Sequence, residues 1–145
     1  MDSGVLKAIW IKRAKRGVMD SRPSATLVAG RGLVDNANQG GKRQVTVISE
    51  ERWDEIRRTF GADVEPRMRR ANLLVSGIDL ENSRGKTLRI GACRLRLLGE
   101  TRPCERMEEA HPGLQDAMRP HWGGGAYGEV LDDGAIAVGD AVTLE

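Results

Sequence analysis

The sequence consists of short apolar segments separated by glycine-rich turns. Its 145 residues include 18 glycines but only five prolines. Short apolar runs between such turns are typical of strands that pair through tight connections. The length suits one domain with a core of its own, and we expect residues 1–145 to form a single domain.

Alternating and β-branched segments predict the strands. The expected strands cover residues 5–13, 24–30, 43–49, 71–77 and 93–102, with a further strand ending near 91. In the 93–102 segment, Arg94 and Arg96 alternate with Leu95 and Leu97, so Cys93 should face the interior with the leucines. The end of the chain, residues 126–145, reads as two strands around Asp-Asp-Gly, which predicts a hairpin.

One segment has the pattern of an amphipathic helix. Within residues 49–61, Trp53, Ile56 and Phe60 fall on one face, Ser49 can cap the start and Gly61 can end the helix. Residues 112–122 predict a second, shorter helix. We find no regular alternation of strands and helices. The expected fold class is therefore mainly β, a β-barrel with a few short helices.

Composition narrows the classes of function. The chain has 23 basic and 21 acidic residues, a balance unlike that of a strongly basic nucleic-acid-binding domain. A small RNA-binding barrel stays as an alternative, although few aromatic residues are present to stack on bases. No segment has the length of a membrane span or the pattern of a signal peptide, so we expect a cytoplasmic protein without a membrane partner.

Cys104 has the surroundings of a reactive thiol. It follows Pro103, and Arg102 and Arg106 lie two residues to either side. Nearby cations lower the pKa of a cysteine, and the thiolate is the form that binds soft metals and attacks electrophiles. The alternative is a small apolar side chain that fills space. Cys93 lies between apolar neighbours and fits that structural role.

Two further segments offer ligands for an anion. Arg70 leads into the expected 71–77 strand and Asn72 lies two positions later, so both should project from one face, where they could contact an oxyanion. Asp35 and Asn38 lie in a glycine-rich loop before a buried strand, a frequent place for binding residues. With Arg102, these four residues are the cofactor-binding candidates. The alternative for each is an ordinary solvent-exposed position.

The order of several short motifs resembles the MOSC domain, which is named after the C-terminal region of molybdenum cofactor sulfurases. The motifs are Arg70-x-Asn72, Ile90-Gly91, Pro103-Cys104 and Gly139-Asp140-x-Val142. The resemblance extends over about residues 4–144. It implies a β-barrel that binds molybdenum cofactor (molybdopterin), with Cys104 as metal ligand and catalytic residue and Arg70 and Asn72 among the cofactor contacts.

The resemblance leaves two roles open. One is an oxidoreductase that reduces N-oxygenated compounds at molybdenum, served by a separate electron donor protein. The other is a non-catalytic carrier of persulfide sulfur or of the cofactor, which would work with a sulfur donor protein. Relatives with the reductase activity have a second cysteine three residues after the first, where this chain has Met107.

Overall fold

The computed structural model describes residues 2–60, 65–103 and 105–145. The strands are β1 (Asp2–Lys12), β2 (Met19–Arg22), β3 (Ser24–Val28), β4 (Gly32–Leu33), β5 (Val45–Ser49), β6 (Leu73–Ser76), β7 (Thr87–Ile90), β8 (Cys93–Glu100), β9 (Ala126–Val130), β10 (Gly134–Ala137) and β11 (Ala141–Leu144). The helices are α1 (Glu50–Phe60), α2 (Glu105–Ala110) and α3 (Leu114–Ala117), with 3-10 turns η1 (Pro66–Arg69) and η2 (Pro120–Trp122). The mainly β composition confirms the expected fold class.

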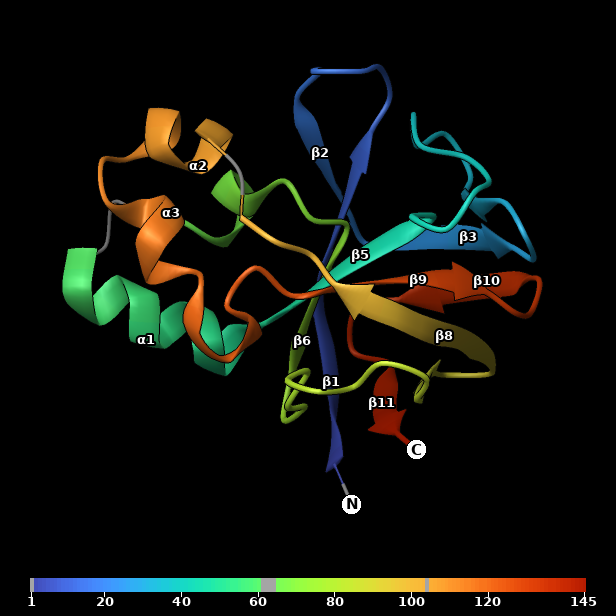
Figure 1. The fold of residues 1–145 in the computed structure, drawn as a ribbon. Helices are drawn as coiled ribbons and strands as arrows, with labels where there is room; N and C mark the ends of the chain where they lie inside the picture. Colours follow the sequence, from blue (N-terminus) through green and yellow to red (C-terminus); the bar gives the residue numbers. More distant parts are fainter. Residues whose placement is uncertain (1, 61–64, 104) are drawn as a thin grey trace.

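Seven strands close into a barrel. They follow the order β11-β7-β8-β9-β5-β6-β1, and β11 pairs with β1 to complete the ring. The closing pair places Asp2 opposite Leu144, so the two ends of the chain lie together (Figure 1). Closure removes the exposed edges that an open sheet would leave. Strand β2 extends the sheet beyond the ring as a hairpin with β1.

The expected hairpin at the end of the chain is wrong. Three strands form there, and β9 pairs with β8 and β5, whereas β10 pairs with β3 in a separate three-stranded sheet, β10-β3-β4. The carboxylate of Asp133 accepts a hydrogen bond from the backbone of Ala29 at 2.7 Å. The Asp-Asp-Gly turn therefore leads the chain away from β9 and toward β3.

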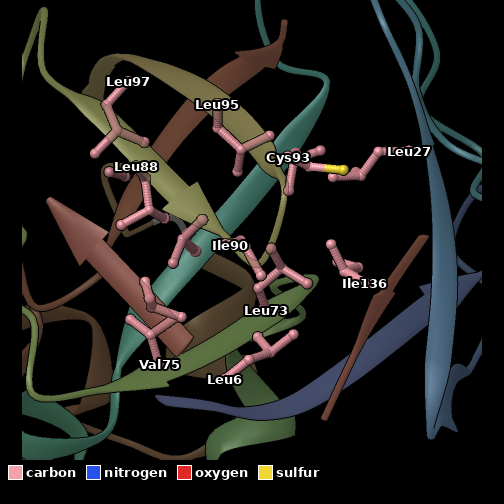
Figure 2. Packing of buried hydrophobic residues seen from close by; sticks show 14 of the residues in the cluster. Leu6, Leu27, Leu73, Val75, Leu88, Ile90, Cys93, Leu95, Leu97 and Ile136 are labelled. Atoms are coloured by element: carbon pink, nitrogen blue, oxygen red, sulfur yellow. The ribbon is translucent and has the colours of Figure 1, made fainter. Parts of the chain in front are cut away.

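Apolar side chains fill the barrel. Cys93, Leu95 and Leu97 on β8 are at most 2% exposed, and Arg96 on the same strand is exposed. This confirms the orientation predicted from the alternation. Figure 2 shows Cys93 in the packed interior with its sulfur toward Leu27. We call the buried cluster that includes Leu6, Ile9, Leu73, Leu88, Ile90 and these β8 residues the barrel core.

Helix α1 connects β5 to β6, which are parallel neighbours. The hydroxyl of Ser49 accepts a hydrogen bond from the backbone of Arg52 at 3.3 Å, which confirms the expected N-cap. Trp53 and Ile56 are buried against α2 and α3. The strand, the helix and the following strand were each expected from the sequence, but the parallel pairing of β5 with β6 was not, and neither was α2. The three helices gather on one side of the barrel (Figure 1).

Candidate functional site

A cavity of about 180 Å³ lies outside the barrel core, against the β5–β6 wall. Val47 and Leu73 belong to the barrel core, so Thr46 and Asn72, which alternate with them, project from the opposite face of the wall. Helix α2, the segment after η1 and the β1–β2 hairpin supply the other sides of the cavity. Segments far apart in the sequence thus meet at one place.

Cations dominate the lining of this cavity, which we call the cation cavity. Among the described residues, the lining contains no carboxylate, and its charged side chains are Lys12, Arg43, Arg69, Arg70 and Arg106. In the described part of the chain, four of these form no ion pair with a carboxylate: Lys12, Arg43, Arg70 and Arg106. Such a set attracts an anion.

Two of the cations, Lys12 and Arg70, have lowered pKa values. Burial lowers the pKa of Lys12, and Arg70, Arg106 and Lys15 lower it further. The pKa of Arg70 is also lowered, by burial and then by Arg106. Each shift means that the surroundings disfavour the charged form. An anion in the cavity would relieve this repulsion.

Arg70 reaches the cavity by an unexpected route. It was expected to lead directly into a strand, but β6 begins at Leu73, and Arg70 has a left-handed backbone with φ of 64° directly after η1. One guanidinium nitrogen, Nη2, donates to the carbonyl of Gly17 at 2.6 Å, which ties Arg70 to the β1–β2 loop. Arg70 and Asn72 do line the same cavity, but strand alternation is not the reason.

Asn72 is 5% exposed and uses its amide within the protein. Its Nδ2 donates to the carbonyl of Trp10 at 3.1 Å and to Oδ1 of Asn36 at 3.2 Å. Its Oδ1 accepts from the backbone of Thr46 at 3.1 Å and from the Thr46 hydroxyl at 3.2 Å. Two donors and two acceptors exhaust the side-chain amide, so Asn72 holds β1, β5 and the loop before β5 together.

Hydrogen bonds hold Thr101, which begins the segment that leads to Cys104. The backbone N–H of Thr101 donates to the carbonyl of Gly125 at 2.9 Å. The buried guanidinium of Arg69 donates through Nε to the carbonyl of Gly124 at 2.9 Å and through Nη2 to that of Thr101 at 3.5 Å. A Cβ at Gly124 would lie 2.2 Å from the Thr101 carbonyl oxygen, so glycine is required for this close approach.

The candidates from the sequence separate into three groups. Arg70, Asn72 and Asn38 line the cation cavity. Arg102 and Asp35 are exposed and are not among its lining residues, and the carboxylate of Asp35 lies 3.9 Å from the guanidinium of Arg22. Cys104 lies outside the described residues.

Sequence reasoning missed two cations of the site. Lys12 ends β1, and Arg43 stands just before β5, so both lie at the boundary of an expected strand. The only indication in the sequence was a cation at the end of an expected strand, and many ordinary surface positions have the same feature. Arg106 was noted only as a neighbour of Cys104 in the sequence.

The MOSC domain family model matches residues 34–143, most of the chain. The chain belongs to the MOSC domain family. The matched region contains every lining residue named above except Lys12. This result confirms the resemblance that the order of motifs suggested.

Solved structures share the fold of this MOSC domain. The YuaD protein from Bacillus subtilis has a TM-score of 0.81 at 22% identity, covering 98% of this chain and 95% of that one. YiiM from Escherichia coli has a TM-score of 0.72 at 17% identity, covering 97% of this chain and 69% of that one. YiiM from Geobacillus stearothermophilus has a TM-score of 0.70 at 17% identity, covering 99% and 73%.

Among curated proteins, none matches the chain significantly. Within the described residues, no helix has the length and apolar character needed to cross a bilayer.

Proposed function

We propose that this MOSC domain binds molybdenum cofactor, with an anionic part of the cofactor in the cation cavity and Cys104 as the protein ligand of the metal. The observation that carries the proposal is that every charged lining residue among the described residues is a cation, which suits a phosphate-bearing pterin. Membership of the MOSC family supports the same cofactor. When bound, the cofactor supplies a molybdenum centre able to transfer an oxygen atom.

The cavity residues have different tasks in this proposal. Arg70 offers a planar fork suited to a phosphate, and Lys12 and Arg106 add charge. Asn72, whose amide is fully engaged, keeps the wall in place and does not contact the ligand directly. Asn38 contributes an amide to the lining. Arg102 and Arg106 flank Cys104 in sequence and favour its thiolate form.

Two roles of the bound cofactor follow from the family. A reductase of N-oxygenated compounds and a carrier of the cofactor both use an anion site beside a reactive thiol, whereas a carrier of persulfide sulfur uses the thiol. The reductase needs an electron donor protein, and the carrier needs a sulfur donor. Reduction of an N-hydroxylated compound by loaded protein, supplied with a chemical reductant, separates the reductase from the carrier.

Cofactor content tests the shared step. Protein is purified from a host that makes the cofactor, and molybdenum and pterin are measured separately. Cys104→Ser should lose molybdenum but keep metal-free pterin. Arg70→Ala should lower the content of both, because removing a charge-assisted hydrogen bond weakens binding by about 1.5–3 kcal/mol. Arg58→Ala, an exposed arginine on α1, is the matched control and should keep both. Wild-type contents in Arg70→Ala would place the cofactor elsewhere.

A further inference from the structure

Thr101 lines the cation cavity, and among the described residues its buried hydroxyl has no hydrogen-bond partner. It follows β8 directly and is 3% exposed. Its backbone N–H and carbonyl are bonded to Gly125 and Arg69. Among the residues that the structure describes, Oγ1 is a buried side-chain oxygen without a hydrogen bond. Native proteins rarely leave a buried hydroxyl in this state.

Thr46 is a second threonine in the same cavity, and its hydroxyl is hydrogen-bonded. Polar surroundings alone therefore do not explain the missing partner of the Thr101 hydroxyl. The Thr46 hydroxyl donates to Oδ1 of Asn72 at 3.2 Å and accepts from the Asn72 backbone at 3.1 Å. The wall therefore satisfies the hydroxyl of Thr46 but not that of Thr101. Valine has the same shape as threonine and would avoid the unpaired hydroxyl. An unpaired buried hydroxyl is costly unless a ligand supplies its partner.

The charged residues that line the cavity with Thr101 indicate that the partner of its hydroxyl is an anion. Lys12, Arg70 and Arg106 line the same cavity, and no carboxylate does so among the described residues. Rotation about Cα–Cβ exchanges the hydroxyl and methyl positions between staggered rotamers, so the hydroxyl can turn toward a ligand without movement of the backbone. A hydroxyl beside several cations is suited to donate to an oxyanion oxygen.

We propose that the Thr101 hydroxyl donates a hydrogen bond to a phosphate oxygen held in the cation cavity, and so helps to select phosphate-bearing ligands. This inference rests on the proposed function, because it places a ligand in the same cavity. The phosphate belongs either to the pterin cofactor or to free inorganic phosphate, and the Thr101 hydroxyl would donate to an oxygen of either.

The test compares Thr101→Val, Thr101→Ser and Thr101→Ala with the wild type. Inorganic phosphate is titrated calorimetrically into protein without cofactor, and pterin content is measured in protein from a host that makes the cofactor. Loss of a hydrogen bond to a charged oxygen should weaken phosphate binding about tenfold to a hundredfold in Thr101→Val. Thr101→Ser should bind like the wild type. Thr87→Val, on β7 and outside the cavity lining, is the control that should bind normally.

Thermal unfolding without ligand gives an independent readout with the opposite sign. Thr101→Val should melt at or above the wild-type temperature, because an unpaired buried hydroxyl is removed. Thr46→Val should melt below it, because Asn72 loses a partner. A purely structural Thr101 would not combine unchanged stability with weaker phosphate binding.

The outcomes are separable. If the wild type binds phosphate and Thr101→Val binds it equally well, the inference is overturned and the proposed function is untouched. Equal loss in Thr101→Ser and Thr101→Ala would assign the effect to packing and also overturn it, as would a clearly lowered melting temperature in Thr101→Val. If the wild type takes up neither phosphate nor pterin, both proposals fail. Lower phosphate affinity with normal pterin content supports the contact and assigns it to free phosphate.

Discussion

The barrel core and the cation cavity lie on opposite faces of the same β5–β6 wall, and their side chains differ in polarity, charge and hydrogen bonding. Val47 and Leu73 face a core in which the buried side chains are apolar. On the other face, Thr46 and Asn72 border a cavity whose charged lining residues, among those the structure describes, are all cations. The same cavity has a left-handed Arg70 and, within the described part of the chain, a Thr101 hydroxyl without a hydrogen bond. The core stabilises the fold, whereas the cavity carries unfavourable features that a bound anion would relieve. Backbone strain such as the left-handed conformation of Arg70 is commonly found at functional sites.

The largest expected effect comes from a cavity-creating substitution in the barrel core. Leu95 is fully buried on β8. Leu95→Ala should lower the free energy of unfolding by about 2–5 kcal/mol, measured by urea denaturation. If the two regions are independent, the folded fraction should still bind inorganic phosphate with wild-type affinity. A large loss of affinity per folded molecule would show that the core and the cavity are coupled.

The buried thiol provides a smaller test of the same contrast. A Cβ at Gly134 would lie 2.8 Å from Sγ of Cys93, so the space is tight. Cys93→Ser should lower the free energy of unfolding by about 1–3 kcal/mol, because it buries a hydroxyl among apolar groups. Phosphate binding should stay unchanged. A variant that melts normally but loses cofactor would assign the functional thiol to Cys93 instead of Cys104.

Alkylation of the wild type with iodoacetamide gives the matching measurement. Burial raises the pKa of the Cys93 thiol, and Asp132, Asp140 and Asp133 raise it further. Cys93 should therefore stay unmodified in the folded protein, while Cys104 should react below the pH at which an ordinary thiol reacts. Mass spectrometry of the labelled peptides distinguishes the two. Equal labelling would contradict a tuned site at Cys104.

The smallest effect is expected from Lys12, where charge is disfavoured without a ligand. Its pKa is lowered from the ordinary 10.5, so the folded state binds the proton less tightly than the unfolded chain. The charged ammonium therefore destabilises the protein at neutral pH. This destabilisation disappears as pH rises from the lowered pKa through 10.5, because the amine is then neutral in both states.

Lys12→Met keeps the length of the side chain and removes the charge. At neutral pH and without phosphate, it should raise the free energy of unfolding by about 0.5 kcal/mol or less, because Lys12 is only partly buried and solvent screens it. The gain should vanish near pH 10.5. Thermal melts across this pH range measure it. Phosphate affinity should fall, and a variant that is less stable at neutral pH would contradict the electrostatic interpretation.

Much of the local structure was predictable because neighbouring residues decide it. The alternation of arginine and leucine gave the orientation of β8, with Cys93 inside. Ser49 and the spacing of Trp53 and Ile56 gave helix α1 and its buried face. The order of short motifs led to the MOSC family. Strand pairing at the end of the chain was not predictable, because β10 finds its partner in β3, more than a hundred residues earlier.

The amino-acid sequence indicated most of the strands, although not β2 or β4, and it also indicated which side of β8 is buried and which family the chain joins. These properties depend on periodicity and on motifs taken in order. Only the tertiary structure decided the site. Lys12, Arg43 and Arg106 have no common motif, and they line one cavity because barrel closure, the β1–β2 hairpin and helix α2 bring them there. The left-handed Arg70 and the unpartnered hydroxyl of Thr101 likewise result from long-range packing, which no local pattern encodes.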